Sequence, residues 1–254
     1  KVKNRLVDPS KDNMLNIYTD LQTISVDPRL YHHKLQDFNN SKVNMEVRDI
    51  VDTWKQGHEN KETQLIFIDR YQKTSKHIDG FNPKTKKQKI KTTVDFNLID
   101  DMTDKLVALG IPREQIGSIH DTKSDDDKEE FFSKIRDGDV RIVFASTAKM
   151  GVGTNVQTRG KHLRHLTYPM RSIDVEQRNK RFVRQGNMNS EVYLHYPTTK
   201  DSGDLSLLQM IDRKDQMTKQ IMSCDFENMA RSYEANFSPS YEDIMAITTG
   251  NSAI

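Results

Sequence analysis

The fold class is set by residues 116–145, which read IGSIHDTKSDDDKEEFFSKIRDGDVRIVFA. Short apolar runs open and close this segment, at Ile116–His120 and Val140–Ala145, and their length is typical of buried strands. Between them a helical pattern runs from Ser124 to Ile135 and opens with three aspartates, which suit the positive end of a helix dipole. A strand, a helix and a second strand in this order predict a parallel pair joined by a right-handed crossover.

The same alternation continues on both sides of the segment. Upstream, the apolar run Leu65–Ile68 is typical of a buried parallel strand, and a helix is expected over residues 97–109, with Gly110 placed to end it. Downstream, we expect a weaker strand, a helix and a last strand at His162–Tyr168, Ile173–Arg184 and Val192–Tyr196. The sequence therefore predicts an α/β domain of three layers with a mostly parallel sheet.

Helical patterns also flank that domain. A helix with apolar residues at Met14–Ile24 should end at Asp27–Pro28, because the residue before a proline avoids the α region. Ser41 is placed to cap the helix that follows. After the last strand we expect a long helix at Asp204–Met222 and a short one at Tyr241–Ile247. The domain should therefore carry helical N- and C-terminal extensions.

Composition excludes several classes of protein. The 254 residues are 34% hydrophobic and 30% charged. No apolar run approaches the roughly 18 residues of a membrane span, so no membrane partner is expected. Cys224 is the only cysteine, which excludes a disulfide framework and a cysteine-based zinc site, and we expect no metal site. A cytoplasmic location is the default. Because the chain begins without Met, we expect a fragment of a longer protein.

The charge of the chain is unevenly distributed. The net charge is only +2, but residues 71–94 hold seven lysines and one acid, Asp79. Residues 161–184 form a second basic region. Local basic patches can bind phosphates even where the total charge is near neutral. For the lysine-rich insert at 71–94, a solvated loop and a DNA contact are equally good interpretations.

The first candidate site is the loop after the strand at 140–145, because ligands of a parallel sheet bind at the carboxyl ends of its strands. Residues 146–157 read STAKMGVGTNVQ, with Gly151 and Gly153 two apart. Such a loop lets backbone N–H groups approach a phosphate or a ribose closely. An ordinary turn remains the alternative, since Gly-x-Gly is common in turns.

The second candidate site is the segment QRNKRFVRQG at residues 177–186. Arg181 and Arg184 are three apart and should share a helix face, while Phe182 and Val183 can turn toward the core. Arginines held on a rigid helix beside a strand-end cleft suit bidentate contact with phosphate. A solvated basic face is the bland alternative.

In their order and spacing these segments resemble the RecA-like C-terminal lobe of superfamily-two helicases, and of Swi/Snf-type ATPases in particular. The resemblance covers roughly residues 20–197 and is most specific at residues 177–186. The strings STAKMGVGTNVQ and RQGN are most similar to phage and mobile-element proteins that fuse such a helicase to an adenine-specific DNA methylase. The resemblance implies a bridge from a missing first lobe, the lobe itself and a helical extension, at residues 1–40, 41–200 and 201–254.

The resemblance also implies a role for each candidate residue. ATP and Mg²⁺ would be held mainly by the missing N-terminal lobe of the same parent chain, with neither expected on this chain alone. Here Arg181 and Arg184 would act as arginine fingers on ATP. The residues near the nucleotide would be Gly151, Gly153, Asn155 and Gln177. The residues on the DNA backbone would be Thr147, Lys149 and His120.

Three features limit what the resemblance implies. Lys180 stands where the family has Gly or an acid, and the family pattern gives Arg178 no fixed role. The sequence holds neither a phosphate-binding Gly-x-x-x-x-Gly-Lys loop nor an Asp-Glu box for Mg²⁺, so the chain alone should not hydrolyse ATP. It also lacks the methylase motifs. A non-catalytic module that binds DNA or a protein partner is therefore the main alternative, and a sugar-nucleotide enzyme of unrelated family is a third.

Overall fold

The computed structural model describes residues 14–82, 87–150, 154–200 and 202–222. Its centre is a five-stranded sheet in the order β4-β5-β1-β6-β7, and every neighbouring pair of strands runs parallel. The strands are β1 (Thr63–Phe67), β4 (Ile116–Ser118), β5 (Ile142–Ala145), β6 (Gly160–His165) and β7 (Tyr193–His195). The α/β class and the parallel sheet predicted from the alternation are confirmed.

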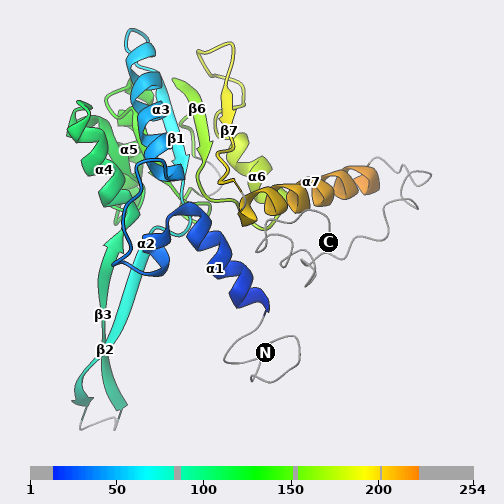
Figure 1. Ribbon diagram of the computed structural model, residues 1–254. Helices are drawn as coiled ribbons and strands as arrows, with labels where there is room; N and C mark the ends of the chain where they lie inside the picture. The colour runs from blue at the N-terminus through cyan, green and yellow to red at the C-terminus, as the bar shows by residue number, and fades with distance from the viewer. Residues whose placement is uncertain (1–13, 83–86, 151–153, 201, 223–254) are drawn as a thin grey trace.

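Helices cover both faces of this sheet (Figure 1). One core lies between the sheet and the helices α3 (Lys42–Gln56) and α4 (Leu98–Ala108), and it takes Ile66 from β1. A second core on the other face takes Leu65 from β1 and packs against α5 (Asp125–Asp137). Successive residues of a strand point to opposite faces, so one continuous apolar run fills both cores. The result is the three-layer arrangement expected of a RecA-like domain.

Local signals place the helix ends as predicted. The Ser41 hydroxyl accepts a hydrogen bond from the backbone of α3, 3.2 Å from the Asn44 nitrogen. Ser124 caps α5 in a reciprocal capping box with Asp127. Gly110 follows α4 with a φ of 101°, a left-handed conformation that glycine adopts without strain.

One predicted helix is shorter than expected. α6 spans Ser172–Asn179 and does not reach Arg184. Backbone bonds after it become irregular, with Arg181 N–H donating to the carbonyl of Arg178 and Arg184 N–H to that of Phe182. The expectation that Arg181 and Arg184 share a helix face is therefore wrong. The expectation for Phe182 is confirmed, since it is 1% exposed, whereas Val183 is 51% exposed and does not face the core.

The lysine-rich insert is not a loop. It forms an antiparallel hairpin of β2 (Gln72–Asn82) and β3 (Lys87–Asn97), which projects away from the central sheet (Figure 1). The sequence does contain a strand pattern here, since β-branched residues recur among the lysines at Thr74, Ile78, Ile90 and Val94. The many lysines make this pattern hard to recognise.

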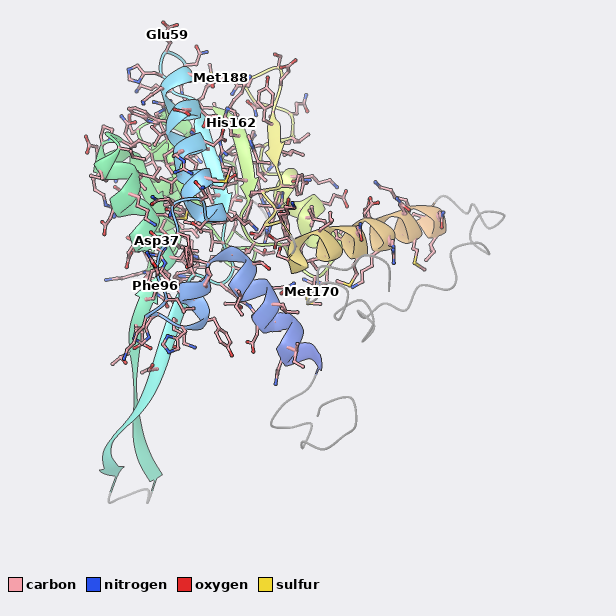
Figure 2. All side chains as sticks on the ribbon, viewed as in Figure 1. Asp37, Glu59, Phe96, His162, Met170 and Met188 are labelled. Carbon is pink, nitrogen blue, oxygen red and sulfur yellow. The ribbon has the colours of Figure 1, made fainter. Side chains whose placement is uncertain are left out.

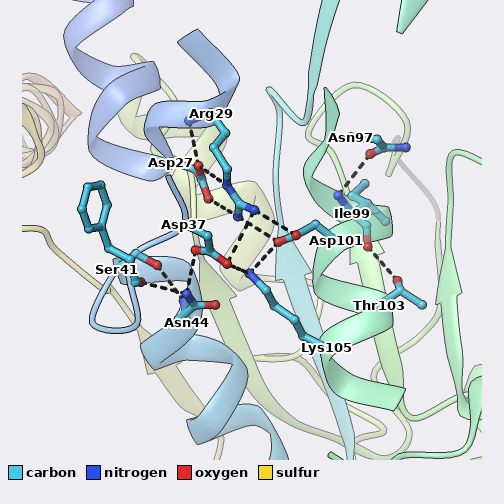
Figure 3. A network of polar contacts seen from close by, with 11 residues as sticks. Asp27, Arg29, Asp37, Ser41, Asn44, Asn97, Ile99, Asp101, Thr103 and Lys105 are labelled. Atoms are coloured by element: carbon cyan, nitrogen blue, oxygen red, sulfur yellow. Dashed lines mark hydrogen bonds and ion pairs between the residues drawn. The ribbon is translucent and has the colours of Figure 1, made fainter. Parts of the chain in front are cut away.

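The N-terminal extension packs on the domain through α1 (Met14–Val26) and α2 (Pro28–Tyr31). Figure 3 shows the polar network that fixes it. The Arg29 guanidinium pairs with Asp27 at 2.7 Å and with Asp101 of α4 at 2.9 Å. Lys105 of α4 pairs with Asp37 at 2.7 Å. Charges from the extension and from α4 alternate in this network, so the two parts are held together at several points.

The C-terminal helix α7 (Gly203–Met222) lies beside α1 and α6. A buried ion pair fastens its first turn, with the Lys42 ammonium 3.0 Å from the Asp204 carboxylate and both side chains 3% exposed or less. The predicted helix at 241–247 lies outside the described residues. Within the described ranges, no helix is long and apolar enough to cross a membrane.

Candidate functional site

A cavity of about 570 Å³ opens at the carboxyl ends of the strands, where a parallel sheet binds its ligands. The strand ends contribute polar groups to it, among them Asp69 after β1, Thr147 after β5 and Thr167 after β6. Gln177 of α6 also lines it. On the far side the cavity is closed by residues of α1, α2 and α7. Its volume falls within the range of small-molecule sites.

A polar cluster of Asp69, Thr147 and Arg178 holds the strand ends together beside this cavity. The Thr147 N–H donates to Asp69 at 2.8 Å, and its hydroxyl lies 3.1 Å from the same oxygen. Arg178 pairs with the other Asp69 oxygen and donates to the Thr147 hydroxyl at 2.6 Å. It also donates to the Thr167 carbonyl at 2.6 Å. One side chain of α6 therefore joins the ends of three strands.

Arg178 is thus a structural residue, contrary to the expectation that it has no fixed role. It is 1% exposed, and its guanidinium lies 4.7 Å from the centre of the Phe67 ring. Burial lowers the pKa of this guanidinium, and the Asp69 carboxylate opposes the shift. No local pattern of residues indicates this role, since Asp69 is more than a hundred residues away in the sequence.

Arg181 and Arg184 meet at a different place, against the loop that follows β5. An Nη1 atom of Arg181 lies 3.2 Å from the Thr154 hydroxyl, and that of Arg184 lies 3.4 Å from the Thr154 carbonyl oxygen. Burial and the neighbouring charge of Arg184 lower the pKa of Arg181. Among the described residues, no carboxylate pairs with either guanidinium. Two adjacent cations without a counter-charge suit an anion with several oxygens, such as a phosphate.

The path of the chain explains why the two arginines do not line the strand-end cavity. Met170 precedes α6 and Met188 follows the arginine segment, and in Figure 2 the two residues lie at opposite ends of the sheet. The chain thus crosses the face of the sheet between them. The expectation that Arg181 and Arg184 face the strand-end cleft does not hold for this cavity, which Gln177 lines and they do not.

The described end of the loop, at 154–157, nevertheless lies beside the arginine segment. Gln157 donates to the carbonyl of Gln185 at 3.2 Å, and the Met188 N–H donates to the carbonyl of Thr158 at 2.8 Å. Asn155 is exposed, and its carbonyl accepts from Arg136 at 3.2 Å. Gly151 and Gly153 lie outside the described residues.

His120 and Lys149 form the third part of the candidate site. The Lys149 ammonium lies 3.4 Å from the His120 carbonyl oxygen, and the His120 ring lies 4.3 Å from that of Tyr71, centre to centre. Burial and the Lys149 charge lower the pKa of His120. Tyr71 stands at the root of the β2–β3 hairpin, so this part of the site adjoins the projecting arm. Sequence reasoning did not single out Tyr71.

Lys180 pairs with Glu176 one turn earlier in α6, while Arg181 next to it turns to Thr154. Its side chain is 66% exposed. The long side chain that departs from the family pattern is therefore directed to the exposed face of α6.

No protein-family model matches the chain. No curated protein matches it either. Among solved structures, it is similar to the C-terminal part of the Fun30 ATPase domain, with 17% identity over 80% of this chain and a TM-score of 0.47.

Two other solved structures are similar over less of the chain. The DUF1998 helicase MrfA bound to DNA has 12% identity over 67% of this chain and a TM-score of 0.42. The E. coli DEAD-box protein SrmB, bound to regulator of ribonuclease activity A, has 12% identity over 60% of it and a TM-score of 0.38. The chain spans 55% of the Fun30 structure, 20% of the MrfA structure and 71% of the SrmB structure.

Proposed function

We propose that this chain is the second lobe of a nucleic-acid-dependent ATPase of the helicase type. It supplies two arginines to ATP held on another lobe, and it contacts the backbone of DNA. The observation that carries the proposal is the pair of guanidinium groups of Arg181 and Arg184. They converge on Thr154, and within the described part of the chain neither has a carboxylate partner.

The chemistry of this pair fits the γ-phosphate of a nucleotide. Charge spreads over the phosphoryl oxygens as the bond to the leaving group breaks, so cations placed there stabilise the reacting state more than the bound one. Arg181 and Arg184 would serve as the two cations. Asn155 lies one residue from Thr154, and Gly151 and Gly153 belong to the same loop, so these residues are proposed to lie against the nucleotide. ATP and Mg²⁺ would be held mainly by the other lobe.

Nucleic-acid contact is proposed for the surface formed by Thr147, Lys149 and His120. The N–H and hydroxyl of Thr147 are committed to Asp69, so Thr147 chiefly fixes the course of the loop there. Lys149 is exposed and supplies the charge. Contacts of this kind position a protein on the phosphate backbone without reading base sequence.

The proposal extends to the parent protein and its setting. The resemblance of STAKMGVGTNVQ and RQGN to strings of mobile-element proteins favours a parent in which this lobe accompanies an adenine-specific DNA methylase. The single cysteine of the sequence, which allows no disulfide within the chain, favours a cytoplasmic location. The other lobe of the same parent would be the direct partner of Arg181 and Arg184.

The test is DNA-stimulated ATP hydrolysis by the parent protein containing both lobes. Arg181→Ala and Arg184→Ala should each lower turnover by about 10³–10⁵, as loss of an arginine finger does, and leave ATP binding nearly intact. Arg48→Ala is the matched control, because Arg48 is an exposed arginine of α3 whose side chain, within the described ranges, bonds only the Asn39 carbonyl. Turnover by both arginine variants at the level of the control would refute the proposal.

A binding module without catalysis is the second candidate. Lys180, where the family has Gly or an acid, and the hydrophobic fraction of only 34% favour it. The same experiment separates the two candidates. A parent that binds DNA but shows no DNA-stimulated turnover, with or without Arg181 and Arg184, would establish the binding module.

A further inference from the structure

We propose that Thr154 is a positioning residue, which holds the guanidinium groups of Arg181 and Arg184 in place for the γ-phosphate of ATP. This inference rests on the proposed function and deepens it, because it names the residue that fixes the arrangement of the two arginines. Two different atoms of Thr154 accept from the pair. Its hydroxyl oxygen lies 3.2 Å from Nη1 of Arg181, and its carbonyl oxygen lies 3.4 Å from Nη1 of Arg184.

The two arginines need such a contact because their side chains are long. An arginine has many rotamers, whereas stabilisation of a reacting phosphate requires the guanidinium to stay within a narrow range of positions. Arg184 is exposed and Arg181 is half-buried, so packing alone does not confine the ends of the two side chains. A contact made before ATP arrives removes their freedom in advance, and the loss then does not oppose the reaction.

Thr154 is uncharged, so it holds the pair without cancelling its positive charge. Arg136 shows the contrast at the same loop. It donates to the carbonyl of the residue after Thr154 at 3.2 Å, but it also pairs with Glu129 at 2.7 Å. A carboxylate at the position of Thr154 would cancel part of the field that an anion meets. Within the part of the chain that the structure describes, neither arginine of the pair has such a partner.

Both sides of the contact rest on backbone that is fixed by the core. Val156, two residues after Thr154, is 1% exposed, and so is Phe182, which lies between the two arginines in the sequence. The two side chains belong to the same apolar core. Gln157 also ties the segments together, since it donates to the Gln185 carbonyl at 3.2 Å. Core packing therefore sets where the two arginines begin, and the contact with Thr154 sets where they end.

The two contacts differ in kind, which makes the role of Thr154 testable. Arg181 contacts the side chain of Thr154, whereas Arg184 contacts its main chain. Valine has the same branched shape as threonine and lacks the hydroxyl. Thr154→Val therefore removes the acceptor of Arg181 and leaves that of Arg184 in place.

The first test is DNA-stimulated ATP hydrolysis by the parent protein containing both lobes. Thr154→Val should lower kcat by about 10–100-fold, because a misplaced group costs up to about 10², while loss of the finger itself costs about 10³–10⁵. The KM for ATP should stay within about twofold of the wild type, since the contact acts on the reacting state. Thr154→Ser keeps the hydroxyl and should retain nearly the full kcat.

Thr158→Val is the matched control. Thr158 follows in the same segment, and its carbonyl accepts from the Met188 N–H at 2.8 Å, but within the described ranges its hydroxyl makes no hydrogen bond. This variant should keep the wild-type kcat. A purely structural role of Thr154 would lower the midpoint of urea unfolding of the 254-residue chain, which Thr154→Val should leave unchanged.

A double-mutant cycle tests whether Thr154 acts through Arg181. Under single-turnover conditions, Thr154→Val should cost little in a protein that already carries Arg181→Ala, because the group that it positions is then absent. A hydroxyl can donate one hydrogen bond while it accepts another, so a direct contact between Thr154 and the phosphate is the competing explanation. Such a contact would cost the same with or without Arg181, and that result overturns the positioning role.

A second measurement follows Arg181 in the 254-residue chain without ATP. NMR relaxation of the Nε atoms reports the order of each arginine side chain. Thr154→Val should lower the order parameter of Arg181 and leave that of Arg184 unchanged, whereas Thr158→Val should change neither.

The inference is overturned if Thr154→Val keeps the wild-type kcat, if its cost is undiminished beside Arg181→Ala, or if Arg181 is equally ordered in the wild type and in this variant. Failure of the proposed function is a separate result. Arg181→Ala and Arg184→Ala would then turn over ATP at the level of the Arg48→Ala control, whatever Thr154→Val does.

Discussion

Replacing Arg178 by alanine should destabilise the chain, whereas replacing the neighbouring Arg181 or Arg184 should change its unfolding free energy little. Arg178 is 1% exposed and joins Asp69, Thr147 and the Thr167 carbonyl. Breaking a buried ion pair by removing one partner costs about 3–5 kcal/mol, because the other charge stays buried without compensation. Asp69 keeps 32% of its side chain exposed, so water solvates part of its charge and the cost lies near the lower limit, at about 3 kcal/mol.

The assay is urea and thermal unfolding of the 254-residue chain. A loss of about 3 kcal/mol corresponds to a fall in Tm of about 6–12 °C for a chain of this size. Arg181→Ala is the control, since the only hydrogen bond that its side chain makes in the described part of the chain is with Thr154, and the unfolding free energy of this variant should change by less than about 1 kcal/mol. Asp69→Asn combined with Arg178→Met should cost less than the two single changes added together.

An unfolding free energy for Arg178→Ala within about 0.5 kcal/mol of the wild type would refute this account. So would strict additivity of the Asp69 and Arg178 changes, because the two side chains would then act independently. In either case the ion pair of Arg178 and Asp69 would not be what holds the strand ends together.

Three further predictions concern the chain by itself. The purified chain should show no ATP hydrolysis, since it has neither a phosphate-binding loop nor an Mg²⁺ box, and turnover that disappears in Arg184→Ala would contradict this. Lys42→Met should cost about 3–5 kcal/mol in urea unfolding, because it leaves Asp204 buried without its partner, whereas the exposed Lys55→Met should cost little. Burial lowers the pKa of His165 to about 3 and that of His162 to about 4, so the unfolded chain binds more protons below about pH 6.5. As the pH falls from about 6.5 toward 4, the unfolding free energy should therefore decrease, while it should stay constant above pH 6.5. The decrease should be smaller in the His165→Gln variant. An equal decrease in the wild type and in this variant would exclude His165 as its source.

Local patterns were sufficient for the class of fold. The apolar run of β1 and the capping residues Ser41 and Ser124 act through neighbours in the sequence, and each predicted element of the sheet is present. The run fills two cores because adjacent side chains on a strand point to opposite faces of the sheet. A continuous apolar run in the sequence therefore predicts a strand that is buried on both faces.

The hairpin and the true length of α6 were not predicted from the sequence, for two different reasons. In residues 72–97 the lysines dominate the composition and hide the alternation of strand-forming residues. After Asn179 the sequence keeps a helical spacing of apolar residues. Phe182 nevertheless packs in the core against Gly160, and the helix ends at Asn179, which allows the Phe182 side chain to take that position. Packing against a distant strand overrides the local preference.

The sequence by itself determined the parallel α/β domain, its capped helices and the order of the two candidate segments. Only the tertiary structure decided which arginine serves which purpose. Arg178, Arg181 and Arg184 stand three apart and look alike in the sequence, yet Arg178 is buried against Asp69 and the other two lie against Thr154. The role of a guanidinium depends on the charges and the solvent around it, and those are supplied by residues that only folding brings near.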